Sequence, residues 1–151
     1  MTYTFDITKK TRTIFFHLLE SHSLEQLNKK PEGFNNTIFW NIKHVVVTQQ
    51  LLTYGLSGLP MLLSKAEIEA FKKGSKTEVA ATNEEVNLLK KQLFSTLKQT
   101  EEDYKKGLFK TYTEYTVSTK STLTTIDEAL EFNNFHEGIH LGYVLALKKG
   151  V

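Results

Sequence analysis

Apolar side chains recur every three or four residues in four long segments of the chain. In an α-helix this spacing places them along one face, which is the pattern of a helix that packs against a core. The two prolines, at positions 31 and 60, both lie outside these segments. The sequence therefore predicts long helices at about residues 6–22, 36–54, 83–104 and 126–147.

The second of these segments contains three consecutive valines, Val45 to Val47, which by themselves favour a strand because β-branched side chains are restricted in a helix. The length of the segment and the continuing spacing of Trp40, His44 and Leu51 favour a helix instead. Since the segment is apolar on most sides, we expect this helix to be buried.

Capping boxes mark several helix starts: a Ser or Thr is followed three residues later by Glu or Gln, and each side chain bonds the other residue's backbone. Such pairs stand at four expected helix starts: Ser23–Gln26, Ser64–Glu67, Thr82–Glu85 and Thr125–Glu128. The second pair predicts a short connecting helix over residues 65–73, which ends at Gly74. The stretch from residue 107 to residue 125 is rich in threonine and tyrosine, and we expect it to be extended or irregular.

Four long amphipathic helices in 151 residues predict an all-α protein built as a four-helix bundle. The length is that of one domain, covering residues 1–151. The connection from residue 55 to residue 82 is long enough to cross the bundle between the second and third long helices. We expect the core to include Leu18, Leu51, Leu93 and Leu97.

Composition excludes several classes of function. The 19 Lys and Arg residues against 17 Asp and Glu residues leave a net charge of +2, too small for a dedicated nucleic-acid-binding surface. The absence of cysteine means that any metal must be held by nitrogen and oxygen ligands. No segment reaches the roughly 20 apolar residues of a membrane span, and the N-terminal residues lack a signal-peptide pattern. We therefore expect a cytoplasmic protein without a membrane or nucleic-acid partner.

The last helical segment contains the motif H-E-x-x-H, formed by His136, Glu137 and His140. On a helix the two histidines lie one turn apart on the same face, as they do in the zinc site of a metalloprotease. That face is the apolar stripe predicted to point into the core. Two imidazoles buried together without partners are costly, and a shared cation removes this cost. The alternative is that both imidazoles form hydrogen bonds with polar groups in the core.

A metalloprotease of this type takes its third metal ligand from a residue further along the chain. After His140 the chain has no histidine or acidic residue, and the expected positions are occupied by Tyr143 and Ala146. Glu137 lies about 100° round the helix from the histidine face, so we expect it on a solvated face rather than as a general base. The sequence therefore argues against a protease.

A third ligand is available on the second long helix. His44 lies in the apolar stripe of that helix without a nearby charge that would account for it. Three histidines from two helices of a bundle form a site that leaves other coordination positions open. We therefore predict that His44, His136 and His140 bind a metal. His17 and His22 have no second ligand at helical spacing and are expected to be structural or solvated.

Four other side chains are predicted to line the open side of this site: Trp40, Asn41, Asn133 and Tyr143. The two asparagines lie one helical turn or less from a metal-binding histidine, where an amide can contact a ligand or orient an imidazole. An equally good alternative is that both amides are buried and satisfy the backbone or each other.

The arrangement of these motifs resembles the DinB-like superfamily of metal-binding four-helix bundles. The resemblance rests on W-x-x-x-H from Trp40 to His44 and on H-x-x-x-H-x-G from His136 to Gly142. The flanking segments 31–40 and 57–60 are also similar, so that the resemblance covers nearly the whole chain. In this family the position of Glu137 is variable.

The resemblance implies that residues matching His44, His136 and His140 hold a divalent cation, which is zinc, nickel or iron in different members. Characterised members include thiol transferases and a thiol-dependent maleylpyruvate isomerase, which implies a small-molecule thiol as partner. A metal bound by three neutral imidazoles acts as a Lewis acid that lowers the pKa of a bound thiol or water. The resemblance alone favours the thiol.

A second hypothesis is a non-catalytic protein whose metal fastens two helices together, with the chain assembled as a homodimer. A fourth protein ligand would favour this structural role, whereas an exchangeable water would favour catalysis. Three histidines suit several divalent metals, so the sequence leaves the metal undetermined.

Overall fold

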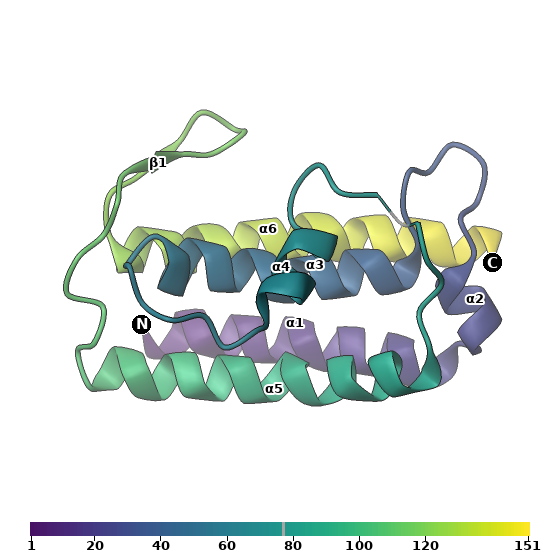
Figure 1. The fold of residues 1–151 in the computed structure, drawn as a ribbon, viewed down its shortest axis with the longest axis horizontal. Coiled ribbons are helices and arrows are strands. Elements are labelled where there is room, and N and C mark those ends of the chain that lie inside the picture. The colour runs from purple at the N-terminus through teal and green to yellow at the C-terminus, as the bar shows by residue number, and fades with distance from the viewer. Residues whose placement is uncertain (77) are drawn as a thin grey trace.

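The computed structural model describes residues 1–76 and 78–151, and most of these residues are helical (Figure 1). The long helices are α1 (Thr2–Ser21), α3 (Ile38–Gln50), α5 (Asn83–Lys105) and α6 (Ile126–Leu147). Two shorter helices, α2 (Leu24–Asn28) and α4 (Lys65–Phe71), lie in the connections. The prediction of an all-α protein is confirmed.

The four long helices lie side by side (Figure 1). Helix α1 packs against α5 and α6, and α3 packs against α6 and α5. Each helix contributes apolar side chains to one continuous core, which includes Phe15, Leu19, Ile42, Val46, Leu89, Leu93 and Leu147. This burial is what the helical spacing of apolar residues predicts. Among the described residues, no helix is both long and apolar enough to cross a membrane.

Local capping sets where several helices begin. All four predicted capping boxes form, with the Ser or Thr side chain accepting from the backbone three residues on and the Glu or Gln side chain accepting in return. Helix α1 has no side-chain cap and begins at Thr2 rather than at the predicted residue 6. The extra turn brings Phe5 into a cluster with Leu97 and Leu130, and this burial accounts for the earlier start.

The helix predicted over residues 36–54 consists of α3 and a π-helical turn at Leu51–Gly55. Val45, Val46 and Val47 are completely buried within α3, which confirms a buried helix rather than a strand. Leu51, predicted as part of the buried core, is only partly buried: it packs against the core and also borders a cavity. The other three leucines predicted for the core, Leu18, Leu93 and Leu97, are buried.

The threonine-rich stretch forms a short hairpin of β1 (Tyr115–Thr116) and β2 (Thr122–Leu123), as its lack of helical spacing suggested. The strands are antiparallel, with Tyr115 opposite Leu123. In Figure 1 the hairpin projects from one end of the helices. Part of it, Tyr115 and Val117, reaches the cavity that contains the candidate site.

Replacement of Leu93 by alanine is expected to lower the free energy of unfolding by about 2 to 5 kcal/mol, because the side chain is completely buried and its removal leaves a cavity. Leu88→Ala is the matched control, since Leu88 lies on the same helix and is 46% exposed. It is expected to cost less than about 0.5 kcal/mol. Urea unfolding of both variants gives the comparison, and equal losses would contradict the packing of α5.

Candidate metal centre

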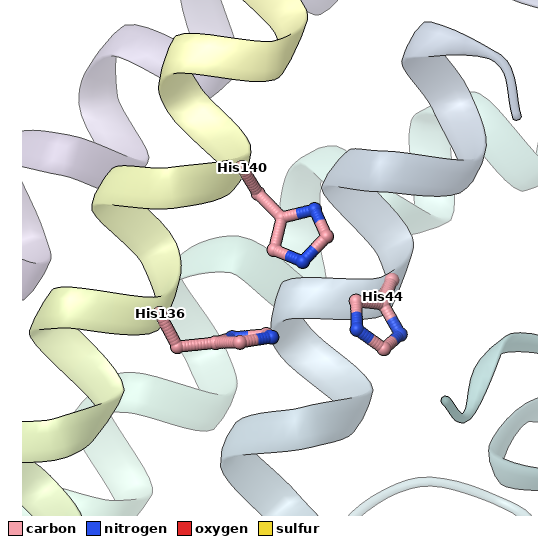
Figure 2. Close-up of side chains that lie close together, drawn as sticks. All are labelled: His44, His136 and His140. Carbon is pink, nitrogen blue, oxygen red and sulfur yellow. The ribbon is translucent and has the colours of Figure 1, made fainter. Parts of the chain in front are cut away.

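Three histidines converge between two of the long helices. His44 comes from α3, and His136 and His140 come from successive turns of α6 (Figure 2). Each offers one ring nitrogen such that the three nitrogens lie within 4.8 Å of one another. The ring centres are separated by 4.6 to 5.2 Å. The structure thus brings together the three residues that the sequence predicted as ligands.

The ring of His44 is held on one edge and on one face. Its Nδ1 lies 2.6 Å from the carbonyl oxygen of Phe71, at the end of α4, so that Nδ1 carries the proton and donates it to this oxygen. The lone pair is then on Nε2, which lies 3.3 Å from the hydroxyl of Thr48. Trp40 stacks on the imidazole with a ring separation of 4.5 Å and an angle of 11°. These contacts fix both the tautomer and the orientation of the ring.

Asn41 orients His140 in a similar way. The Nδ1 of His140 lies 2.8 Å from Oδ1 of Asn41. The amide nitrogen of Asn41 donates to the carbonyl oxygen of Thr37 at 2.8 Å, which turns its oxygen toward the imidazole. An oxygen only accepts, so Nδ1 of His140 carries the proton and Nε2 carries the lone pair. An imidazole held by such a partner is typical of metal-binding histidines.

His136 differs because its Nδ1 is buried without a hydrogen-bond partner among the described residues. A buried polar atom without a partner is unfavourable by about 1 to 3 kcal/mol. Each of the three rings offers a nitrogen within 4.8 Å of the other two, so these nitrogen donors fit a divalent cation. The chemistry of this donor set suits zinc, nickel, iron or copper.

Burial keeps all three imidazoles neutral near neutral pH. Burial, together with smaller contributions from the neighbouring His140 and His44, lowers the pKa of His136 to about 3. Burial and the proximity of His44 lower the pKa of His140 to about 4. Burial also lowers the pKa of His44, against the opposing effect of its hydrogen bond to Phe71. Neutral imidazole is the form that coordinates a metal.

These pKa values predict how the stability of the metal-free protein depends on pH. In the unfolded chain the histidines titrate near 6.5, whereas in the folded chain they titrate at lower pH. Below about pH 6.5 the unfolded chain therefore binds more protons, and the folded state loses up to about 1.4 kcal/mol per pH unit for each histidine. Urea unfolding between pH 7 and 5.5 is expected to show this loss.

His136→Ala is expected to reduce this pH dependence, because it removes the histidine whose pKa is lowered to about 3. His17→Ala is the control, since His17 is exposed on α1 and lies outside the cluster. The explanation fails if wild type and His136→Ala have the same dependence on pH.

A cavity of about 1020 Å³ opens beside the three histidines. Trp40, Asn41 and Tyr143 line it, and Tyr143 lies at its rim with 55% of its surface exposed. Asn133 is not among the described residues that line the cavity. Its amide nitrogen instead donates to Glu137 at 2.9 Å, so the structure places Asn133 in a buried contact on another side of α6.

The prediction that Glu137 is solvated is wrong, because its side chain is completely buried. Its carboxylate accepts from Nη2 of Arg12 at 2.9 Å and from Nε of the same residue at 3.2 Å. Arg12, also completely buried, donates in addition to the carbonyl oxygen of Leu93 and the hydroxyl of Thr96, both at 3.0 Å. The pair therefore joins α1, α5 and α6, and Glu137 is directed away from the cavity.

The burial of Glu137 follows from the position of α6, which packs against both α1 and α3 and so has two inward faces. The sequence does contain one indication that a buried carboxylate is needed. Arg12 lies between Thr8 and Phe15 on the buried face of α1, where an unpaired guanidinium would be very unfavourable. The backbone contact from Phe71 to His44 has no comparable signal, because any residue supplies a carbonyl oxygen.

The other two histidines lie outside the cluster. His17 is exposed, and Nδ1 of His22 lies 2.8 Å from the carbonyl oxygen of Leu18. Both were expected to be structural or solvated.

Asn41→Leu is expected to weaken metal binding by about 10- to 100-fold, because His140 loses the acceptor that fixes its tautomer. Asn41→Asp keeps an acceptor oxygen but loses the donation to Thr37, so it is expected to retain more affinity than Asn41→Leu. Competition with a chromophoric chelator measures both variants. Equal affinity of wild type and Asn41→Leu would show that this contact does not support the site.

Comparison with known proteins identifies the family of the chain. A search of curated proteins found no match. A family model described as the DinB superfamily matches residues 7–144, a range that includes the three clustered histidines and nearly all of the four long helices. The chain therefore belongs to the DinB superfamily.

Proposed function

We propose that His44, His136 and His140 bind one divalent cation and that the protein is a metal-dependent enzyme acting on a small molecule. The observation that carries this proposal is the convergence of three neutral imidazoles, one buried and two partly buried, at the wall of a cavity of about 1020 Å³. Membership of the DinB superfamily supports it. A divalent cation supplies Lewis acidity, which lowers the pKa of a bound thiol or water.

The surroundings of the histidines favour catalysis over a purely structural metal. Within the part of the chain that the structure describes, the cluster has three potential ligands and no fourth His, Asp or Glu. A site with three protein ligands beside a cavity leaves a position for water or substrate, whereas structural zinc sites usually have four protein ligands. A non-catalytic metal that fastens α3 to α6 is the alternative function.

A thiol substrate is favoured over water. Hydrolytic metal sites commonly use a carboxylate as general base. No Asp or Glu is among the described residues that line the cavity, and Glu137 is paired with Arg12 elsewhere. A thiol has an ordinary pKa near 8.5, so it needs less assistance to lose its proton near neutral pH. We therefore propose thiol transfer, with zinc, nickel or iron as the metal.

The fold proposal is that α1, α3, α5 and α6 form a DinB-type four-helix bundle as a single domain. Residues 56–82, which contain α4, would cross the bundle between its second and third long helices. The end of α4 would then have a direct role, because its Phe71 carbonyl holds His44. The proposal includes no nucleic-acid partner, which the net charge of +2 supports.

The test begins with protein purified without added metal and without a polyhistidine tag, whose metal content is measured. Metal-loaded and metal-free protein are then incubated with cysteine and an aryl chloride electrophile. Formation of the aryl thioether is expected to be faster with the metal-loaded protein, and His44→Ala is expected to behave like the metal-free protein. Equal rates with and without metal would contradict the proposed activity.

A further inference from the structure

The cavity beside the histidines has an unbalanced charge. Among the described residues that line it, Lys73 is the one side chain with a permanent charge, and none is an Asp or Glu. The lining is therefore positive even before any metal is considered, and a positive cavity attracts anions.

Lys73 is held at the edge of the cavity by a fixed turn. The backbone nitrogen of Ser75 donates to the carbonyl oxygen of Lys72 at 3.1 Å, with Lys73 and Gly74 between them. Gly74 has a φ of +86°, a conformation that glycine adopts without strain. The tight turn therefore places Lys73 at a defined point of the chain.

The turn is fastened to α3 on both sides of Lys73. Before it, the carbonyl oxygen of Phe71 accepts from Nδ1 of His44 at 2.6 Å. After it, the hydroxyl of Ser75 accepts from Nε1 of Trp40 at 3.2 Å. Lys73 is thus connected to the two aromatic residues that stack on each other beside the candidate metal centre. A ligand that contacts these rings lies within the cavity that Lys73 also lines.

The charge of Lys73 is not neutralised within the described chain. Lys73 is exposed and forms no ion pair with a described residue. Its neighbour Lys72 pairs with Glu69, and the buried Lys43 pairs with Glu67. Lys73 is therefore available to a ligand, whereas these two lysines already have partners.

The remaining lining is mainly apolar and aromatic. It includes Phe34, Trp40, Leu52, Phe132, Ile139 and Tyr143. Such walls bind the apolar part of a ligand, and a few polar groups fix its orientation. The combination of an apolar wall with one cation at the edge defines the kind of molecule that fits.

We propose that the cavity binds a small molecule with an apolar ring or chain and one carboxylate, which Lys73 binds. The apolar part lies against the aromatic walls beside the three histidines. An organic cation is disfavoured, because no Asp or Glu is among the described lining residues and Lys73 would repel it. This inference deepens the proposed function by naming its substrate class, and it rests on that function only for the statement that the ligand is a substrate.

The test measures binding of three molecules of one shape to the full chain: 2-naphthoate, 2-naphthalenemethanol and 2-naphthylmethylammonium. Metal-free protein is used first, because a metal would itself attract the carboxylate. We expect 2-naphthoate to bind about five- to tenfold more tightly than the alcohol, because one partly exposed ion pair contributes only modestly to affinity. The ammonium compound is expected to bind most weakly. Calorimetry or ligand fluorescence gives the dissociation constants.

Lys73→Gln is expected to remove the preference for 2-naphthoate while leaving the affinity for the alcohol unchanged. Lys76→Gln is the matched control: it removes the same charge three residues further along the connection, from a residue outside the cavity lining. Equal effects of the two substitutions, equal affinities for naphthoate and alcohol in the wild type, or no binding of naphthoate would overturn the inference.

Zinc titration of the same proteins separates this inference from the proposed function. Lys73→Gln is expected to bind zinc as the wild type does, because Lys73 is not one of the clustered histidines. Absence of the naphthoate preference in the wild type, with normal zinc binding, contradicts only the ligand class. Failure of the wild type to bind zinc, with the naphthoate preference retained, contradicts only the metal-dependent function.

Discussion

Glu137→Gln is expected to lower the free energy of unfolding by about 3 to 5 kcal/mol, because it leaves the guanidinium of Arg12 buried without its counter-charge. Arg12→Met is expected to have a similar effect, since it leaves the carboxylate of Glu137 buried and unpaired. Chemical unfolding of the two single variants measures both losses. Each would be a large fraction of the stability of a typical domain.

The double variant Arg12→Met/Glu137→Leu distinguishes a paired charge from general loss of packing. Removal of both charges leaves neither one unpaired, so the double variant is expected to be more stable than either single variant. Asp6→Asn serves as a control, because Asp6 pairs with Lys10 on the exposed side of the same helix and is expected to have little effect. Additive losses in the double variant would contradict a coupled buried pair.

The second large effect is on metal affinity. His44→Ala, His136→Ala and His140→Ala are each expected to weaken metal binding by more than about 100-fold, which exceeds the usual effect of removing a supporting contact. The three losses should be similar, because each variant removes one of three ring nitrogens that lie within 4.8 Å of one another. Competition titration near neutral pH measures the affinities of the folded variants.

Glu137→Gln gives the contrast with a metalloprotease. In such an enzyme the glutamate of H-E-x-x-H is the general base, so this substitution would abolish hydrolysis with the metal retained. Here Glu137 is paired with Arg12, and its loss is expected to appear mainly in the stability of the fold. Measurement of metal affinity on the folded fraction separates the two effects. A more than 100-fold loss of affinity would show that Glu137 itself contributes to the site.

Much of the helical structure was predictable because its causes are local. The capping boxes at Ser23, Ser64, Thr82 and Thr125 all form as predicted, since each depends on two residues three positions apart. The buried helix around Val45 was also predictable, because the length and periodicity of the segment outweigh the preference of valine for strands.

The convergence of the histidines was predictable for a different reason. His136 and His140 share a helix face because they are four residues apart. That spacing carries no information about His44, which was assigned from its place on an apolar face and from the resemblance to a family. The distance between the two helices is a tertiary property, and the structure supplies it.

The environment of Glu137 was not predictable from one helix alone. Its angle from the histidine face suggested solvent, but a second helix, α1, covers that side and provides Arg12. The partly buried Leu51 has a similar explanation, because the π-helical turn that contains it borders the cavity. Both differences arise from how helices pack together, which the pattern within one helix does not determine.

The most direct test of the metal centre is the zinc content of purified, folded His44→Ala. Circular dichroism first establishes that the variant retains its helices, and His17→Ala, which changes an exposed histidine, serves as the control. After loading with zinc, the proposed metal centre predicts about one zinc per chain in the wild type and in His17→Ala, and no retained zinc in His44→Ala. Retention of one zinc per chain by His44→Ala would contradict a centre shared between α3 and α6.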